Sequence, residues 1–384
     1  MRIIILALVF IVLFCLPDLY ISLALMRGAA WWAHLLLWLP SITVVLLLAS
    51  NLITGFGRTK IYLVIGLLLC LALPQLIFLI ISLLGKLTGL VWSPAAPIGI
   101  GLGIAVGAIV VLATSYGMLF GWKRLAVKEV ELSFADLPKE FDGYTIVHLA
   151  DLHIGTHGDN KTFVEKVVRR TNEAKPDLIV FTGDLVNTQA KETELFEPLL
   201  SQLQATDGVL SVLGNHDYCF YGMRERPADP HQEADKVVEA ERRMGWEVLL
   251  NAHRMIRRGE AQIAVAGVED IGKPPFEGMG DLKAALAGIP DSTFTILLSH
   301  DPSHWRMEVT PETDIPLTLS GHTHAAQLKL GRWSPARWLY PEWGGLYEEG
   351  SQRLYVSEGL GGSVPIRIGT KPEIVVYRLR HLEN

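Results

Sequence analysis

The chain has 384 residues, a formal net charge of −6, and 19% charged residues against about 25% in a typical soluble protein. Half of the residues are hydrophobic and only three are cysteines, which excludes a disordered chain and a small disulfide-framed protein. Residues 1–120 carry five basic residues and one acidic residue, which leaves 29 basic and 39 acidic residues for 121–384. This acidic surplus disfavours nucleic acid as a partner.

Residues 1–122 are predicted to form a transmembrane region with about four helices. Crossing about 30 Å of hydrocarbon takes about 20 helical residues, and each of four apolar stretches is long enough. Asp18 in the first stretch follows Pro17 and is expected near an interface or against Arg27; its role stays open. The four stretches are Ile3–Met26, Trp31–Ile53, Ile61–Leu84 and Ile98–Phe120.

The basic residues of the connecting segments predict the orientation of this region. With four spans, six basic residues lie on the side that holds both termini, and only Arg27 and Lys86 lie on the other. The positive-inside rule then places both termini in the cytoplasm. The six residues are Arg2, Arg58, Lys60, Lys123, Arg124 and Lys128.

From residue 123 to residue 384, short β-branched runs alternate with amphipathic helical runs, which predicts a single α/β domain. Strands are expected at Tyr144–Ala150, Asp177–Thr182 and Val209–Leu213, with helices at Thr162–Ala174 and Glu192–Ala205 between them. The further expected elements are a helix at Glu233–Met244 and strands at Glu247–Leu250, Gln262–Val268, Thr293–Leu298, Ile315–Leu319, Leu354–Ser357 and Glu373–Leu379.

Five of these strands are followed within three residues by an Asp, Asn or His side chain. Ligands bind beyond the carboxyl ends of strands in open α/β sheets, so these side chains are expected to converge on one site. Carboxylate, imidazole and amide oxygen suit Mn²⁺, Fe or Zn²⁺. The seven candidate metal ligands are Asp151, His153, Asp184, Asn215, His300, His322 and His324.

Seven ligands suffice for two metal ions if one side chain bridges them. Two ions about 3.5–4 Å apart can generate a hydroxide and stabilise both oxygens of an in-line phosphoryl displacement. A single Asp-x-His or Gly-Asp is more often a solvated loop or a plain turn. The five elements in this order favour a two-metal centre.

The elements DLH (151–153), GD (183–184), GNHD (214–217), SH (299–300) and GHTH (321–324) make the chain resemble the calcineurin-like metallophosphoesterase superfamily. The segments at 321–328 and 354–365 resemble its bacterial subgroup with N-terminal membrane helices. That resemblance implies a four-layer α/β/β/α sandwich. One departure is Ala325-Ala326 in place of the usual Gly-Gly, which adds two methyl groups near the metals and is expected to narrow the substrate slot.

The resemblance also implies roles for the site residues. Asp184 would bridge the two ions, His216 would face the substrate phosphate or the leaving group without binding metal, and Asp217 would orient His216. Cys219 has no obvious base and is expected to pack rather than to act as a nucleophile. One ion would be held by Asp151, His153, Asp184 and His324, and the other by Asp184, Asn215, His300 and His322.

Two loops are candidates for substrate contact. Arg224 and Arg226 lie in a loop rich in Pro and Asp, where a solvated face is the alternative. Residues 331–350 crowd tryptophans and tyrosines together with arginines, and such residues favour a membrane interface and phosphate. A loop packed onto its own domain is the alternative. The candidates in this second loop are Arg332, Arg337, Trp338 and Trp343.

The sequence therefore predicts a membrane-anchored phosphoesterase with two metal ions, Mn²⁺ being favoured over Fe or Zn²⁺. Its substrate would be a phosphomonoester or a phosphodiester or pyrophosphate, with membrane lipids as partners and a lipid-linked substrate favoured. Some relatives hydrolyse the pyrophosphate of UDP-2,3-diacylglucosamine. The expected location is a bacterial inner membrane with the catalytic domain in the cytoplasm. The alternative is a membrane scaffold whose phosphoesterase domain only binds.

Overall fold

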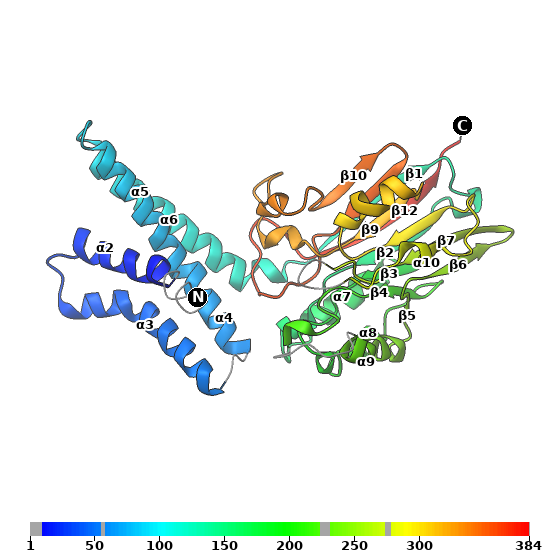
Figure 1. Ribbon diagram of the computed structural model, residues 1–384, viewed down its shortest axis with the longest axis horizontal. Helices are drawn as coiled ribbons and strands as arrows, with labels where there is room; N and C mark the ends of the chain where they lie inside the picture. Colours follow the sequence, from blue (N-terminus) through cyan, green and yellow to red (C-terminus); the bar gives the residue numbers. More distant parts are fainter. Residues whose placement is uncertain (1–9, 55–57, 223–230, 273–277, 384) are drawn as a thin grey trace. The chain divides into compact units, whose positions relative to one another are not determined.

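The structure is a computed structural model that describes residues 10–54, 58–222, 231–272 and 278–383. The chain divides into two compact units, Met1–Phe120 and Gly121–Asn384 (Figure 1). The first unit is helical, and the second is built on two β-sheets.

The N-terminal unit contains apolar helices interrupted by two wide π-helical turns. The turns at Ile11–Cys15 and Leu68–Ala72 lie just before Pro17 and Pro74. Proline donates no backbone hydrogen bond and its ring crowds the preceding turn, so a widened turn accommodates it. The α-helices are α2 (Leu16–Ala24), α3 (Trp31–Thr54), α4 (Arg58–Leu67), α5 (Leu73–Thr88) and α6 (Ala95–Leu119).

Among the described residues, three helical segments are long and apolar enough to cross a membrane. They are Trp31–Ser50, Tyr62–Thr88 and Ala95–Lys123. The first predicted stretch begins in residues outside the described part, and its described portion, Ile11–Ala24, is shorter than a span. Three candidate spans are therefore found where four were predicted, and the first of the four predicted spans is not confirmed.

Small and polar residues hold this unit together. Gly99, Gly103 and Gly107 recur every fourth residue on α6 and are buried, which allows close approach of α5. The carboxylate of Asp18 is fully buried and accepts a hydrogen bond from Ser41 Oγ at 2.5 Å. Asp18 therefore contacts the neighbouring helix α3 rather than Arg27, and its predicted position near a membrane interface stays a prediction.

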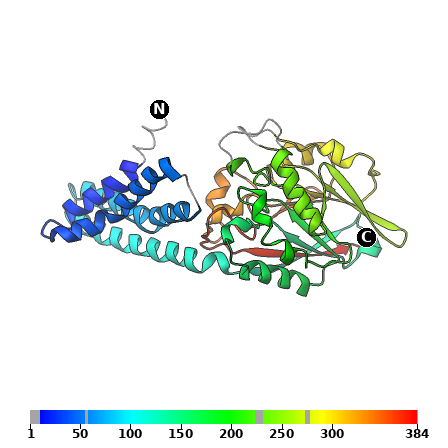
Figure 2. The same ribbon diagram turned by 90° about the horizontal axis from the view of Figure 1, so that it is seen from below.

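The C-terminal unit contains two six-stranded sheets, which Figure 2 shows from a second direction. The first has the order β1-β12-β2-β3-β4-β5 and the second has the order β10-β11-β9-β8-β7-β6. Strands β2, β3 and β4 run parallel, as do β8 and β9. The strands are β1 (Ala126–Phe134), β2 (Thr145–Leu149), β3 (Leu178–Thr182), β4 (Val209–Val212), β5 (Glu247–Val248), β6 (Ala252–Arg258), β7 (Ala261–Gly267), β8 (Thr295–Leu298), β9 (Leu317–Ser320), β10 (Gly345–Glu349), β11 (Gln352–Val356) and β12 (Glu373–His381).

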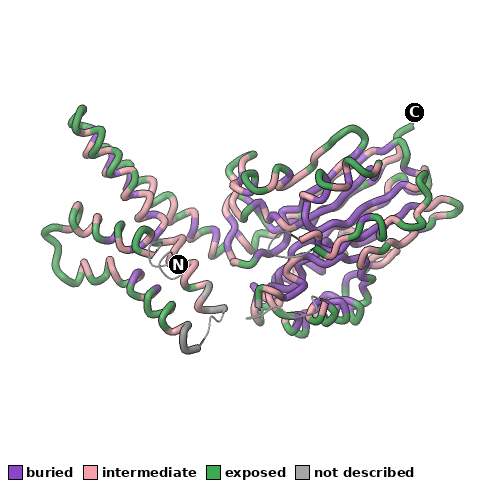
Figure 3. The backbone as a smooth tube through the Cα atoms, viewed as in Figure 1, coloured by how far each residue is buried: buried purple, intermediate pink, exposed green. Residues whose placement is uncertain are grey.

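The two sheets pack face to face around a common apolar core, so the unit is a mixed α/β sandwich. Ile146 and Val180 of the first sheet share this core with Val265 and Leu298 of the second. The helices α7 (Thr162–Glu173), α8 (Glu197–Leu200) and α9 (His231–Arg243) cover the outer face of the first sheet, and α10 (Leu282–Leu286) covers that of the second. Figure 3 shows the sheets as the most continuously buried part of the unit.

Several elements differ from the prediction. Strand β1 was missed because it is half exposed, and strand β10 was missed because it lies within the aromatic loop. The helix expected at Glu192–Ala205 is reduced to a 3₁₀ turn at Ala190–Thr193 and the single turn of α8, which starts next to Pro198. Proline fits only in the first turn of a helix, so the longer helix does not form.

Candidate metal centre

The carboxyl ends of five strands from both sheets build one site. Asp151 follows β2, Asp184 follows β3, and Asn215 follows β4 in the first sheet. His300 follows β8 and His322 follows β9 in the second. Because these strands are parallel neighbours within each sheet, their ends meet at one edge of the sandwich, and Asp151 and His322 become neighbours although they are 171 positions apart in sequence.

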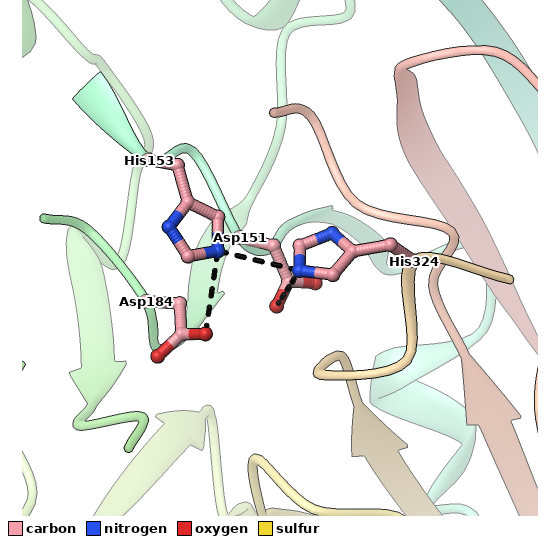
Figure 4. Close-up of side chains that lie close together, drawn as sticks. All are labelled: Asp151, His153, Asp184 and His324. Atoms are coloured by element: carbon pink, nitrogen blue, oxygen red, sulfur yellow. Dashed lines mark hydrogen bonds and ion pairs between the residues drawn. The ribbon is translucent and has the colours of Figure 1, made fainter. Parts of the chain in front are cut away.

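The first group of candidate ligands is drawn in Figure 4. Nε2 of His153 lies 3.4 Å from Oδ2 of Asp184 and 3.3 Å from Nε2 of His324. Nε2 of His324 lies 3.9 Å from Oδ1 of Asp151. One ligand atom from each of these four residues lies within 4.8 Å of the others, which is the spacing that a single metal ion requires.

The second group shares Asp184 with the first. Nε2 of His300 lies 3.4 Å from Oδ2 of Asp184, the same oxygen that faces His153. Asn215 Oδ1 lies 3.1 Å from His300 Nε2 and 2.9 Å from His322 Nδ1. The structure thus brings all seven candidate ligands together in two groups, with one carboxylate oxygen of Asp184 between them.

The donor set fits cations better than it fits hydrogen bonds alone. Two imidazole pairs, His153 with His324 and His300 with His322, approach at 3.3 Å and 3.1 Å through their nitrogens. Nitrogens facing each other repel unless a proton or a cation lies between them. Oδ2 of Asp151 is buried with no hydrogen-bond partner among the described residues. Such oxygen and nitrogen ligands suit borderline-to-hard divalent ions.

Electrostatics also favours a positive charge at this site. Burial raises the pKa of Asp151 to about 7 and that of Asp217 to about 6. Burial by itself would also raise the pKa of Asp184. The nearby imidazoles of His300 and His216 nevertheless hold the pKa of Asp184 well below its ordinary range. A cation within a few ångströms stabilises ionised carboxylates, so an ion between these groups offsets the cost of their burial.

The backbone at this site is strained. Five of the seven candidate ligands adopt positive φ angles between 45° and 73°, a region that residues other than glycine rarely occupy. Such strain costs about 1–3 kcal/mol per residue and clusters at functional sites. The five are Asp151, His153, Asp184, His322 and His324.

The residues next to the ligands explain two features of the sequence. Gly214 and Gly321 allow close approach, because a Cβ at Gly214 would clash with Oδ1 of Asp184 and one at Gly321 would lie 2.6 Å from Oδ2 of Asp151. Ala325 and Ala326 both have positive φ, at 51° and 48°. These are the positions where glycine was expected, so the methyl groups add backbone strain as well as volume.

His216 and Asp217 lie at the site, but Asp217 contributes differently from the expectation. Nδ1 of His216 lies 2.7 Å from the carbonyl oxygen of Asn187, and this contact orients the ring. The Asp217 carboxylate instead accepts backbone N–H groups at 2.7–3.2 Å. The expectation that Asp217 orients His216 is therefore wrong: Asp217 joins the loops that carry Asp184 and Asn215. Its four donors are Asp184, Leu185, Val186 and Gly214.

The residues that were predicted to contact substrate differ in their exposure, and two of them lie outside the described residues. Arg224 and Arg226 lie outside the described residues. Arg332, Arg337 and Trp338 are exposed. Trp343 is partly buried, and its backbone carbonyl accepts a hydrogen bond from Thr323 Oγ1 at 2.6 Å. Trp343 therefore supports the loop of the candidate ligands, whereas the side chain of Trp338 is exposed to solvent.

Three residues at the site were missed. The Tyr340 hydroxyl lies 2.6 Å from Nε2 of His322, and the Tyr221 ring stacks on that of His216 with centroids 4.2 Å apart. Arg367 is fully buried and donates hydrogen bonds to carbonyls of the loop at 358–361, which packs against Asp151. Only Tyr340 had a signal in the sequence, as part of the aromatic loop at 331–350.

Comparison with known proteins supports a single family. The model of the calcineurin-like phosphoesterases matches residues 144–326. The metallophosphoesterase YkuE of Bacillus subtilis is 32% identical over 296 residues, which cover 71% of this chain and 94% of YkuE. A transmembrane protein with metallophosphoesterase domain from Danio rerio is 32% identical over 269 residues, which cover 67% of this chain and 58% of that protein. The UDP-2,3-diacylglucosamine pyrophosphatase LpxG of Chlamydia trachomatis is 28% identical over 296 residues, which cover 63% of this chain and 86% of LpxG.

Proposed function

The chain belongs to the calcineurin-like phosphoesterase family, a family of metal-dependent hydrolases, and on this premise we propose that it is a membrane-anchored phosphoesterase with two metal ions. The observation that carries the proposal is the position of Asp184 Oδ2, which lies 3.4 Å from both His153 Nε2 and His300 Nε2. Asp151, His153 and His324 would complete one ion site around it, and Asn215, His300 and His322 the other.

Two divalent ions at these positions would polarise a phosphoryl group and activate water near neutral pH. His216 is the side chain proposed to assist the leaving group. Its Nδ1 faces the Asn187 carbonyl, which can only accept, so Nδ1 carries a proton. Nε2 is then the nitrogen that serves the substrate, and it donates a proton to the leaving oxygen only from the doubly protonated ring.

The proposed substrate is a phosphomonoester or a phosphodiester or pyrophosphate attached to a lipid. The name of the Chlamydia trachomatis relative, a pyrophosphatase of a diacylated nucleotide sugar, supports this class. The three apolar helices support it as well, because an enzyme held at a bilayer meets lipid head groups directly. The excess of basic residues on one side of the spans supports a cytoplasmic site at a bacterial inner membrane.

Purified full-length protein tests the reaction. We expect about two bound metal ions per chain, Mn²⁺ or an ion of similar chemistry, and hydrolysis of p-nitrophenyl phosphate or bis-p-nitrophenyl phosphate that chelation abolishes. Metal binding without any turnover would instead support the scaffold alternative. A panel of phospholipids, polyprenyl phosphates and diacylated nucleotide sugars then tests the substrate class, and activity confined to water-soluble esters would refute the lipid assignment.

A further inference from the structure

The segment Leu330–Leu339, here called the tip, exposes large apolar side chains on the C-terminal unit. Leu330, Trp338 and Leu339 are 62%, 75% and 79% exposed. The Trp333 ring meets the Trp338 ring edge-on, with centroids 5.4 Å apart, so the two tryptophans of the segment contact each other. Exposed apolar side chains that gather in this way mark an interaction site rather than an ordinary surface.

The tip is held in place by hydrogen bonds to the loop of the candidate ligands. Ser334 Oγ donates to the carbonyl of Ala325 at 2.6 Å, directly after His324, and accepts the N–H of Ala336 at 3.1 Å. Ser334 and Ala336 are buried. The apolar side chains are therefore presented on a fixed support next to the metal centre.

The tip lies close to the point where the chain enters the C-terminal unit. This unit begins at Gly121, and the last candidate span ends at Lys123. Gly121 packs on the carbonyl of Arg367, where a Cβ would clash. The next residue, Ile368, accepts the N–H of Lys329 at 2.8 Å, and Lys329 directly precedes the tip. A candidate membrane span ends at this entry point, and this favours a position of the adjoining surface close to a bilayer.

Basic residues lie in the tip and at the entry point. Arg332 and Arg337 of the tip are exposed, and neither forms an ion pair with any residue in the described part of the chain. Lys123 and Arg124 add two more basic residues at the entry point. Apolar and aromatic side chains flanked by arginines match the boundary between acyl chains and anionic head groups.

We propose that the tip inserts Leu330, Trp338 and Leu339 into the interfacial layer of a bilayer that contains anionic lipid. Arg332 and Arg337 then contact the phosphates of the head groups. Membrane insertion at this point holds the metal centre next to the lipid surface, which deepens the proposed function by specifying how a lipid-linked phosphoester reaches it. Only this delivery of a lipid-linked phosphoester rests on the proposed function; the insertion of the tip does not.

Fluorescence quenching tests the position of the tip without measuring turnover. A nitrobenzoxadiazole label is placed at Leu339→Cys in full-length protein whose Cys15, Cys70 and Cys219 are changed to alanine. Single chains are reconstituted in nanodiscs that contain anionic lipid and a nitroxide about 5–10 Å below the head groups, the depth at which interfacial apolar faces bury. The control label is at Glu260→Cys, in the turn between β6 and β7 at the opposite edge of the second sheet from β10.

Quenching and a blue shift at position 339, with neither at position 260, are expected. Equal emission from both positions with and without the nitroxide would overturn the proposal. The double variant Arg332→Gln/Arg337→Gln should weaken quenching at 339 in anionic discs, and unchanged quenching would contradict the part assigned to the arginines. Since the readout is position, a protein without esterase activity would refute the proposed function and leave this result standing.

A second measurement avoids the cysteine substitutions. Brominated lipids quench tryptophan emission on contact, so Trp338→Phe should remove a bromolipid-sensitive part of the emission of the otherwise native protein. Trp246→Phe is the control, because Trp246 is buried in the core of the C-terminal unit. If the emission lost with Trp338→Phe is insensitive to bromolipid, the tip does not reach the bilayer.

Discussion

The hydroxyl of Tyr340 lies 2.6 Å from Nε2 of His322, on the side of the ring away from Asn215 Oδ1. If His322 binds metal through Nδ1, its Nε2 carries the proton and donates it to the tyrosine oxygen. Such a partner fixes the orientation and the tautomer of a ligand histidine. This hydrogen bond joins the aromatic loop directly to a candidate metal ligand.

Tyr340→Phe should lower kcat/KM about 10-fold or more, because outer partners of metal ligands typically contribute 10–100-fold to affinity or activity. The measurement is hydrolysis of a soluble diester across a Mn²⁺ titration. Tyr347→Phe is the matched control: it removes a hydroxyl from the same loop, but within the described part of the chain that hydroxyl accepts only the backbone N–H groups of Trp343 and Gly344. Similar losses in both variants would mean that Tyr340 only supports the loop.

Asp184 and His216 should separate metal binding from catalysis. Asp184→Asn removes the charge shared by both groups of ligands, so both ions and all turnover should be lost. His216→Ala keeps the backbone N–H that donates to Asp184 Oδ1 at 2.8 Å, so the metals should stay while the rate falls about 10²–10⁴-fold. Elemental analysis and ester hydrolysis check both. Full metal occupancy and rates near wild type in the two variants would refute these assignments.

Asp217→Asn should destabilise the C-terminal unit rather than change the reaction directly. In wild type the backbone N–H groups donate to a carboxylate. In the variant one carboxylate oxygen is replaced by an NH₂ group, which faces these N–H groups and cannot accept from them. Losing buried hydrogen bonds to a charged group costs at least about 2–3 kcal/mol. Denaturant unfolding measures the loss. Asp281→Asn is the control, because among the described residues the exposed carboxylate of Asp281 accepts only the N–H of Ala284 at the start of α10. Equal stability of the Asp217 and Asp281 variants would contradict this role.

The orientation in the membrane is testable with fusions at the C-terminus. The excess of basic residues on one side predicts a cytoplasmic C-terminus and a cytoplasmic metal centre. A fused alkaline phosphatase should then be inactive, because it folds only outside the reducing cytoplasm, and a fused green fluorescent protein should fluoresce. The reverse pattern would place the substrate on the outer side of the membrane.

The strands that carry the site were predictable because each is a short, mostly apolar and buried run that a candidate ligand follows closely. Strand β3, at Leu178–Thr182, matches the predicted Asp177–Thr182 to within one residue, and Asp184 follows as expected. Burial on both faces leaves such strands little freedom, so the local pattern is sufficient.

The remaining site residues depend on long-range packing that leaves no local pattern. Tyr340 reaches His322 only because Ser334 and Trp343 anchor the loop around it. Arg367 has no motif, since its partners are backbone carbonyls that any sequence supplies. The role of Asp217 was misassigned for the same reason: a carboxylate beside a histidine suggests a side-chain pair, whereas its partners are backbone N–H groups of two loops.

His148 gives the protein a predicted sensitivity to acid that is separate from the metal centre. It lies in β2, fully buried, with Nδ1 3.0 Å from the Tyr377 hydroxyl and Nε2 2.8 Å from Thr182 Oγ1. Burial lowers the pKa of His148 from 6.5 to about 3. Below pH 6.5 the unfolded chain therefore binds a proton that the folded chain excludes.

Stability should fall as the pH is lowered from about 6.5 toward 3, and at pH 5 the contribution of His148 is about 2 kcal/mol. His148→Gln removes the titrating group, so the drop in melting temperature between pH 7.5 and pH 5 should be several degrees smaller than in wild type. Protonation of the candidate ligands acts on both proteins alike and cancels in this difference. His381→Gln, at a partly exposed position at the end of β12, is the control and should retain the wild-type drop. If wild type and His148→Gln lose the same stability on acidification, the folded protein protonates His148 as readily as the unfolded chain does, and the pKa of the buried imidazole is not lowered.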